Sequence, residues 1–320
     1  MATEISSVIK EEYHPLEAKE EVVQVDDDVE RVCIKTEQEN CDDFLETPEE
    51  DTRRLTEEYL RRNPTVVCEM CGLSDINVFN TLLTYIESEI PVLKGATGYE
   101  QLISVLAKLY TDDDTAILNS YLFPSVYVTG VELLYDKLDM LCRNSSLTLP
   151  LPSVFMPEFD STQRVIIIGF LLVSIRSTFE EFPENLHTVK YLIAYSPFGE
   201  VIFVSIAFVG SVSNFSLILL SGILQKLGTE DWILFNERNF IYVSQVKEIS
   251  MKNKKKLRQL NSGSIAEHMS KVVRRVKQFK VLHSFIPDFM LKHQAGVCFL
   301  DKLVFVCCMI LNLFPRIVYY

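Results

Sequence analysis

The first ten residues lack an apolar core, and the eight cysteines lack a regular spacing. Because a secretion signal needs such a core, Met1–Lys10 does not have the pattern of one. Scattered cysteines in a chain of 320 residues are also unlike the dense disulfide framework of a small secreted domain. We therefore expect a reducing compartment in which the thiols stay free.

A second pair of metal-binding side chains is missing beside Cys68 and Cys71, the one CxxC motif of the chain. A structural zinc site takes four ligands, usually two pairs of Cys or His at short spacing. The sequence offers no second pair at a matching distance, so ordinary buried or surface thiols are favoured over a metal site.

Basic side chains are scarce in the first sixty residues, which hold six Lys or Arg against 20 Asp or Glu, whereas residues 241–320 hold 14 against four. Residues 1–54 also have few aromatic side chains and no sustained periodicity. Such a segment cannot bury enough apolar surface to offset chain entropy, so we expect a disordered acidic tail. The segments IKEE at Lys10 and IKTE at Lys35 have the pattern of SUMO acceptors, which implies SUMO-conjugating partners. Chance matches in a tail rich in Lys and Glu are the alternative.

Helical periodicity dominates residues 55–143. The predicted helices are Leu55–Arg62, Asp75–Ile90, Tyr99–Tyr110, Asp114–Leu122 and Val126–Cys142. We assign residues 55–94 to a helical entry segment. Residues 95–143 would form a small all-α, helix-turn-helix-like domain, because short links join its three helices. Residues 144–160 contain three prolines and are expected to be a linker.

Residues 161–320 have the pattern of an α/β domain. Apolar runs bounded by turn formers predict strands at Val165–Ile175, Tyr191–Tyr195, Val201–Val209, Asp231–Leu234 and Phe240–Val243. Pro197 and Gly199 predict a hairpin turn between the second and third runs. Ser264–Leu282 has the stripe of an amphipathic helix, and Leu300–Leu313 is a strongly apolar closing helix.

One alternative for this region is a membrane protein, because residues 201–225 carry no charge over a length that could cross a bilayer. Five serines and Gly210 interrupt the run, however. That composition favours a strand at Val201–Val209, a polar turn at Gly210–Asn214 and a helix at Phe215–Leu227.

Four motifs of this half occur in a characteristic order. They are HTVKYLI at 187–193, FVS to VGSVSN at 203–214, ILFNERNF at 233–240 and LDKLVFVCC at 300–308. Their order and spacing resemble the DDE-superfamily endonuclease domain of Harbinger-type and THAP-associated transposases. Weaker matches upstream extend the resemblance to about Cys68–Val318. It implies a ribonuclease-H-like fold, a mixed sheet with flanking helices, and metal-dependent cleavage of DNA phosphodiesters.

The resemblance also implies three metal-binding carboxylates, of which this chain keeps one. In the family they hold two divalent cations, Mg²⁺ or Mn²⁺, that polarise the phosphate and activate the attacking oxygen. The three positions correspond here to Ile168, Glu237 and Ser270, and an auxiliary aspartate corresponds to Asn214. Because a single carboxylate cannot assemble a two-metal centre, we expect no resident cofactor and no cleavage.

Glu267 is an alternative third ligand, because it precedes Ser270 by about one helical turn. The competing interpretation is a capping box, in which Ser264 and Glu267 start the helix. Even with Glu267 as a ligand, the first position would remain an isoleucine.

Nucleic-acid contact is expected from basic side chains outside the helical domain. The helix at Val126–Cys142 carries three acidic residues against Lys137 alone, which is repulsive near phosphates. The strongest basic footprint is Lys252, Lys254, Lys255, Lys256, Arg258, Arg274, Arg275 and Lys277. We rank recognition by a nuclear import receptor first, weak contact with a DNA backbone second, and a merely solvated face third.

The sequence therefore predicts a transposase-derived nuclear protein without catalysis, acting as a nucleic-acid or protein binding module. An active metal-dependent endonuclease, which would require Mg²⁺ or Mn²⁺, is the first alternative. Membrane association through residues 201–225 is the second.

Overall fold

The computed structural model describes residues 57–112, 123–142, 159, 163–176, 186–237, 240–249, 258–260, 263–291, 293–294 and 297–317, all within one compact unit, Arg53–Tyr320. Several predictions lie outside these residues: the tail with Lys10 and Lys35, the helix at Asp114–Leu122, the lysines of 252–256 and the linker, apart from Phe159. The side chain of Glu237 lies outside them as well.

The amino-terminal part is helical, as predicted. The helices are α2 (Glu57–Arg62), α3 (Pro64–Cys71), α4 (Ile76–Ile86), α5 (Gly98–Thr111) and α6 (Phe123–Cys142). Helix α5 begins with a capping box, in which Thr97 and Glu100 each accept a hydrogen bond from the other's backbone N–H. The link predicted at 123–125 is wrong, because α6 begins at Phe123. Pro124 fits the first helical turn, where its missing N–H costs nothing.

Helix α6 packs against the carboxyl-terminal helix α9 (Phe299–Ile310). The rings of Tyr127 and Phe299 meet edge to face at 6.0 Å between centroids, and those of Tyr135 and Phe305 at 5.1 Å. Such pairs add about 0.5–1.5 kcal/mol beyond burial of their area. The aromatic contacts therefore tie the helices to the α/β part.

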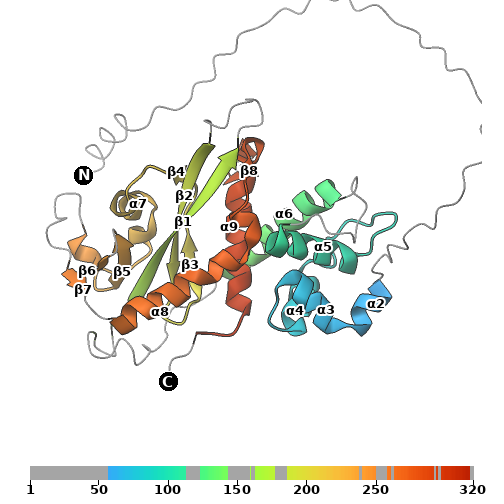
Figure 1. Ribbon diagram of the computed structural model, residues 1–320, viewed down its shortest axis with the longest axis horizontal. Coiled ribbons are helices and arrows are strands. Elements are labelled where there is room, and N and C mark those ends of the chain that lie inside the picture. Colours follow the sequence, from blue (N-terminus) through green and yellow to red (C-terminus); the bar gives the residue numbers. More distant parts are fainter. Residues whose placement is uncertain are drawn as a thin grey trace, which may run out of the picture. The chain divides into compact units, whose positions relative to one another are not determined.

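A mixed sheet forms the centre of the α/β part. Its strands are β1 (Val165–Arg176), β2 (Leu186–Tyr195), β3 (Val201–Val204), β4 (Phe208–Val209), β5 (Trp232–Glu237), β6 (Phe240–Gln245), β7 (Arg258–Leu260) and β8 (Ile286–Pro287). Their order is β3-β2-β1-β5-β6-β7, with β4 beside β2 and β8 beside β1. Strand β1 is antiparallel to β2 and parallel to β5, and helices flank the sheet (Figure 1). This arrangement fits a ribonuclease-H-like fold.

Both faces of β1 are covered. Ile166 and Ile168 belong to an apolar core shared with α7 (Asn214–Leu220). Val165 and Ile167 belong to the core on the opposite face, which α8 (Gly263–Arg274) and α9 contribute to. Because side chains alternate along a strand, the first five residues of β1 are buried on both faces, whereas Leu172 further along the strand is 55% exposed.

The run Val201–Val209 is not one strand. It divides into β3 and β4, because the segment between them bonds to side chains and not only to the ladder. Ser205 Oγ accepts the backbone N–H of Leu192 at 2.9 Å, and Asp301 Oδ1 accepts that of Ala207 at 3.0 Å. The predicted hairpin before β3 is confirmed, with Gly199 in the left-handed region at φ 83°.

Residues 201–225 fold as β3, β4, α7 and a 3-10 turn at Ile223–Gln225, so they do not form the continuous span that the membrane alternative requires. Among the residues that the structure describes, no helix alone is both long and apolar enough to cross a bilayer. Helices α3 and α4 meet those criteria only together, and they bend by 79° at the break between them.

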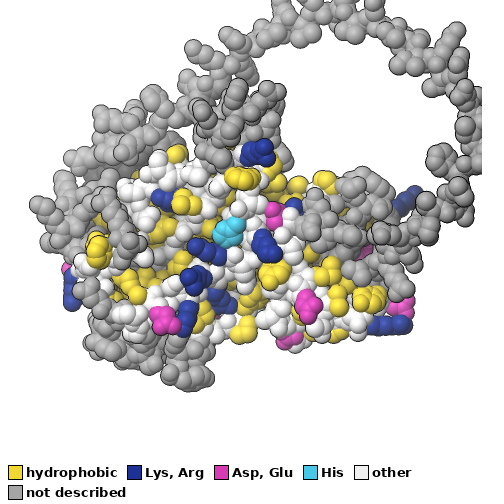
Figure 2. All heavy atoms as spheres, in the orientation of Figure 1, with side chains coloured by type: hydrophobic (Ala, Val, Ile, Leu, Met, Phe, Trp, Pro, Cys, Tyr) yellow, Lys and Arg dark blue, Asp and Glu magenta, His cyan; other side chains and the backbone are white. Residues whose placement is uncertain are grey.

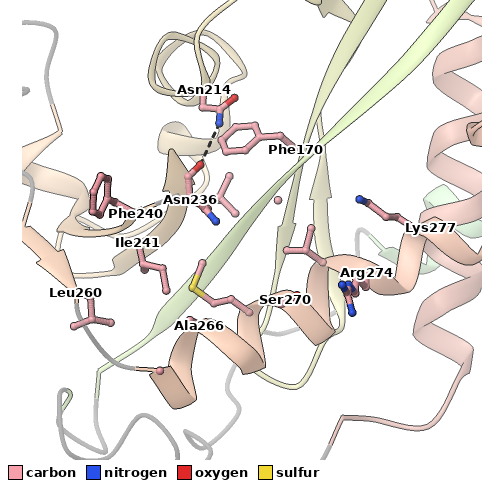
Figure 3. A pocket seen from close by; sticks show the side chains of 15 residues that line it. Phe170, Asn214, Asn236, Phe240, Ile241, Leu260, Ala266, Ser270, Arg274 and Lys277 are labelled. Carbon is pink, nitrogen blue, oxygen red and sulfur yellow. Dashed lines mark hydrogen bonds between the residues drawn. The ribbon is translucent and has the colours of Figure 1, made fainter. Parts of the chain in front are cut away.

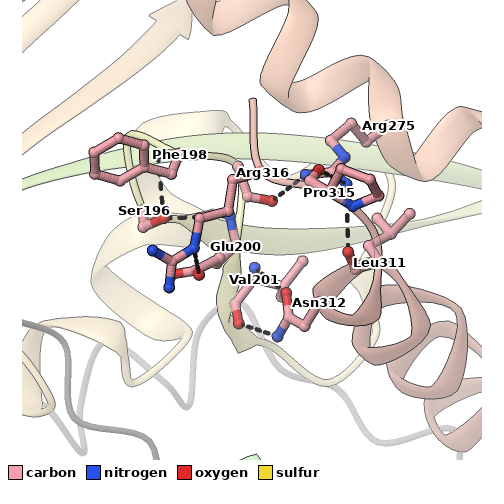
Figure 4. Close-up of polar contacts among 10 residues, drawn as sticks. Ser196, Phe198, Glu200, Val201, Arg275, Leu311, Asn312, Pro315 and Arg316 are labelled. Atoms are coloured by element: carbon pink, nitrogen blue, oxygen red, sulfur yellow. Dashed lines mark hydrogen bonds and ion pairs between the residues drawn. The ribbon is translucent and has the colours of Figure 1, made fainter. Parts of the chain in front are cut away.

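The amphipathic helix predicted at Ser264–Leu282 is shorter than expected. Helix α8 ends at Arg274, and 3-10 turns η6 (Arg275–Gln278) and η7 (Lys280–Leu282) follow. The remaining short elements are η4 (Val246–Glu248), η8 (Asp288–Leu291), β9 (His293–Gln294), β10 (Val297–Cys298) and η9 (Leu311–Leu313). The switch at Arg275 coincides with a cluster of long-range hydrogen bonds (Figure 4).

Arg275 joins three segments that are distant in sequence. Its guanidinium donates to the backbone carbonyls of Gly199 at 3.3 Å, Leu311 at 3.4 Å and Pro315 at 3.0 Å (Figure 4). Asn312 bonds both backbone groups of Val201, at 2.7 and 2.9 Å, and so replaces a neighbouring strand at the β3 edge. This cluster fixes the carboxyl terminus of the described chain to the β2–β3 turn.

Replacing Arg275 with alanine is expected to lower the free energy of unfolding by about 2 kcal/mol, because three carbonyls lose a charged donor. Arg274→Ala is the matched control, because the Arg274 side chain is exposed. Its removal is expected to change the free energy of unfolding by no more than about 0.5 kcal/mol. Urea denaturation of both variants checks this pair. Equal destabilisation by the two would show that the Arg275 hydrogen bonds contribute nothing specific.

Candidate functional site

A groove of about 760 Å³ lies where β1, β5 and α8 meet. The residues that line it are Ile168, Gly169, Phe170, Asn214, Asn236, Phe240, Ile241, Leu260, Gly263, Ala266, Met269, Ser270, Val273, Arg274 and Lys277 (Figure 3). They come from the middle of β1, the start of α7, the hairpin of β5 and β6, β7 and one side of α8 with the turn after it. The groove thus joins segments spread over more than a hundred residues.

The positions that the sequence singled out converge on this groove. Ile168, Asn214 and Ser270 line it, although they lie on three different elements. Glu237 is the last residue of β5 and directly follows Asn236, another lining residue. Its backbone pairs with that of Phe240 on β6. The fold therefore gathers all four positions around the end of β5.

The first of these positions is apolar in its surroundings as well as in its side chain. Ile168 is 1% exposed, and its register partners on either side are Ala194 of β2 and Phe235 of β5. Both partners are fully buried. An isoleucine here extends the apolar core to the wall of the groove.

Asn214, at the position of the family's auxiliary aspartate, makes a hydrogen bond that a carboxylate could not make. The Asn214 side-chain amide donates to the backbone carbonyl of Asn236 at 3.1 Å (Figure 3). An ionised aspartate has no proton to donate and would repel that oxygen. Asn214 therefore links the start of α7 to the end of β5 across the groove.

Comparison with known families gives a match over residues 177–312, to the family described as DDE superfamily endonuclease. This segment is a DDE-superfamily domain. The matched residues run from the end of β1 through α9 and so include the positions of Asn214, Glu237 and Ser270. Comparisons with curated proteins and with solved structures gave no match.

Ile168 precedes the matched segment of the DDE domain, so its correspondence with the first carboxylate rests on the resemblance and on its place in the fold. On β1 it pairs with Phe235, two residues before Glu237. That register places it beside the end of β5, where the second position lies.

The donor set of the groove does not fit a two-metal centre. Divalent Mg²⁺ or Mn²⁺ prefers several carboxylate oxygens, which DDE enzymes generally supply. Among the lining residues that the structure describes none is Asp or Glu, whereas Arg274 and Lys277 are basic and exposed. In the described part of the chain, no three His, Cys, Asp or Glu side chains gather as a metal site would need.

Glu267, the alternative third ligand, is not among the residues that line the groove. Its carboxylate pairs with Lys271 at 2.6 Å, and its side chain is 67% exposed. The hydrogen bond from Lys271, and then the charge of Lys271, lower the pKa of Glu267. The predicted capping box is wrong, because α8 begins at Gly263 and Ser264 already lies inside its first turn.

The basic residues of the sequence prediction divide into two groups within the described chain. Arg258, Arg274 and Lys277 are exposed, and Lys and Arg side chains gather over the end of α8 (Figure 2). Arg275 is half-buried and bonds three backbone carbonyls, so the structure gives it an internal role. Contact with nucleic acid or an import receptor stays a prediction for the exposed group.

Phe170, Asn236 and Phe240 are among the lining residues that the sequence did not predict for the site. Phe240 is a large apolar side chain with 48% exposure, and Asn236 is also exposed. Asn236 and Phe240 could have been predicted from their position, because they lie on either side of the predicted ligand Glu237 in the sequence. Nothing in the strand pattern shows that Phe170 is only half-buried.

The CxxC motif lies on α3, away from the groove residues. Cys71 is buried, and its thiol donates to the Ile103 carbonyl at 3.8 Å. Burial raises the pKa of both thiols, Cys71 more than Cys68. The described cysteines are free thiols, as predicted: Cys68, Cys71, Cys298, Cys307 and Cys308.

Proposed function

We propose that this protein derives from a transposase and has lost DNA cleavage, so that its DDE domain serves as a binding module. The observation that carries the proposal is the groove: it lies at the positions that the resemblance aligns with the family's catalytic carboxylates, and the sequence keeps one carboxylate among them. The superfamily match supports a nuclease-related origin. The loss of activity and the binding role are our inference from the side chains.

The chemistry of the groove supports this inference. Two-metal cleavage uses paired cations to stabilise the charge on the attacking and leaving oxygens. Ile168 has no lone pair to offer a cation, and the hydroxyl of Ser270 carries no charge. Arg274 and Lys277 would repel a cation and attract a phosphate. The groove is therefore suited to an anion and poorly suited to holding Mg²⁺.

We further propose that the helix-turn-helix-like part supports the DDE domain and does not read DNA. Three acidic side chains of α6 and Lys137 stand where a basic reading helix is needed, and Lys137 pairs with Glu89. At Gly130, a Cβ atom would lie 2.5 Å from Val105 of α5. Gly130 thus permits close packing of two helices, at a position where a DNA-reading helix would need a long side chain.

Nuclear localisation completes the proposal, supported by the basic residues of 252–258 together with Arg274 and Lys277. SUMO conjugation at Lys10 and Lys35 is a separate proposal that rests on sequence pattern alone. Imaging of the tagged full chain tests nuclear localisation, and charge reversal of Lys254–Lys256 is expected to reduce the nuclear signal. SUMO conjugation predicts that the SUMO-shifted bands disappear when Lys10 and Lys35 are both replaced by arginine.

The full chain is expected to leave supercoiled plasmid and hairpin DNA intact in Mg²⁺ or Mn²⁺, because one carboxylate cannot hold two cations. Gel analysis of the products checks this, with Glu237→Gln as the matched control for contaminating nuclease. Cleavage that disappears in Glu237→Gln would sink the proposed function and establish the active-nuclease alternative.

A further inference from the structure

The groove has two chemically different ends. Phe240, Ile241 and Leu260 lie at one end, near the start of α8, and Arg274 and Lys277 lie at the other (Figure 3). Because a helix rises 1.5 Å per residue, Gly263 and Lys277 are about 20 Å apart along the helix axis. A nucleic-acid strand of about six nucleotides at the stacked spacing of 3.4 Å would have this length.

The aromatic end holds a ring that is available for stacking. Phe240 is 48% exposed, although large apolar side chains are usually buried in a domain of this size. It begins β6, so a paired strand holds its backbone in place. A ring fixed in this way can stack on any base, because every base has a π face.

The middle of the groove supplies neutral hydrogen-bonding groups. The Asn236 side-chain amide points into the groove, and the Ser270 hydroxyl is exposed on α8 (Figure 3). Amide and hydroxyl groups both donate and accept, which suits the edges of bases. Apolar, neutral polar and cationic groups therefore follow one another along α8.

We infer that this groove binds single-stranded nucleic acid directly, without a divalent cation. One base stacks on Phe240, and Arg274 and Lys277 hold the phosphates towards the other end. The inference rests on the proposed function and specifies its ligand. A single strand is favoured over a duplex because only an unpaired, unstacked base can lie flat on a protein ring. A cation is unnecessary because the lining residues that the structure describes include the basic Arg274 and Lys277 and no carboxylate, so the phosphates can pair with positive side chains directly.

Fluorescence anisotropy on the full chain tests the inference. The probes are a labelled single-stranded DNA of about 12 nucleotides, long enough for one binding groove, its duplex, and an acidic peptide with one tyrosine. We expect the single strand to bind more tightly than the duplex, with equal affinity in EDTA and in Mg²⁺. A requirement for Mg²⁺, or binding of the peptide alone, would overturn the inference.

Two variants locate the binding. Phe240→Leu keeps the site apolar and is expected to weaken single-strand binding by about 5- to 100-fold, the usual effect of losing one stacked base. Phe285→Leu is the control, because Phe285 is 59% exposed and does not line the groove. Circular dichroism confirms that both variants fold.

The double variant Arg274→Gln, Lys277→Gln is expected to reduce the slope of log affinity against log salt by about 1.4, since each phosphate contact on a single strand contributes about 0.7. Lys94→Gln, an exposed lysine outside the groove, should leave the slope unchanged.

The outcomes distinguish failure of single-strand binding from failure of the proposed function. Tight duplex binding that ignores Phe240→Leu would overturn the single-strand inference and leave the non-catalytic binding module intact. Strand cleavage during these titrations, abolished by Glu237→Gln, would instead overturn the proposed function.

Discussion

Replacing Ile168 with aspartate is expected to lower the free energy of unfolding by about 4–6 kcal/mol at neutral pH, although the resemblance to DDE enzymes implies an aspartate at this position. The substitution removes an aliphatic side chain that is 1% exposed, which alone costs about 2–3 kcal/mol. It also places a carboxylate between Ala194 and Phe235, where the remaining cost is desolvation. Chemical denaturation measures the loss.

The pH dependence of this loss identifies its cause. Burial would raise the pKa of the introduced carboxyl above its unfolded value of about 3.9, because the charged form is disfavoured. The folded variant then binds more protons than the unfolded chain, so its stability falls as pH rises from about 4. Ile168→Asn has a similar shape but no titration, so its deficit should be independent of pH over the same interval.

A Mn²⁺ titration of Ile168→Asp tests directly whether this groove can hold a cation. In the wild-type groove the described lining residues include two basic residues and no Asp or Glu. We therefore expect Mn²⁺ to leave the melting temperature of Ile168→Asp unchanged. If Mn²⁺ restored several degrees, the introduced carboxylate and Glu237 would be sharing an ion, and the argument that this groove rejects cations would be wrong.

The elements that the sequence predicted correctly are those with strong local patterns. The run at β1 is long, rich in β-branched residues and buried over its first five residues, and α9 is strongly apolar apart from Asp301 and Lys302. The order of the family motifs also predicted that Ile168, Asn214 and Ser270 belong to one site, and they line one groove. Neither success required knowledge of distant contacts.

The features that could not be predicted depend on partners far along the chain. The break between β3 and β4 forms where the Ser205 hydroxyl accepts the N–H of Leu192, 13 residues away, and Asp301 accepts the N–H of Ala207 from 94 residues away. Arg275 was grouped with surface charges because sequence alone cannot show that three carbonyls surround it. A local pattern describes propensity, whereas these outcomes follow from hydrogen bonds that exist only in the folded chain.

Asp301 shows how one such partner supports the whole sheet, and Asp301→Ala is expected to lower the free energy of unfolding by about 3–5 kcal/mol. Its Oδ1 atom accepts the Tyr191 hydroxyl at 2.8 Å and the Ala207 N–H at 3.0 Å. Tyr191 is fully buried on β2, and Asp301 is 8% exposed. Alanine would leave two donors without a partner, each costing about 1–3 kcal/mol, and would remove a charge from the start of α9.

Two milder variants apportion that loss, with thermal and urea denaturation as the measurement. Asp301→Asn keeps an acceptor oxygen for both donors and should lose about 1 kcal/mol, chiefly the favourable charge at the helix start. Tyr191→Phe removes one hydrogen bond and leaves the one to Ala207, so about 1 kcal/mol is expected. Since Ala207 lies between β3 and β4, an N–H without an acceptor there would loosen the pairing of these strands with β2. Strand β2 in turn pairs with β1, which carries Ile168. Equal losses for Asp301→Ala and Asp301→Asn would show that the charge stabilises the fold and that the two hydrogen bonds do not.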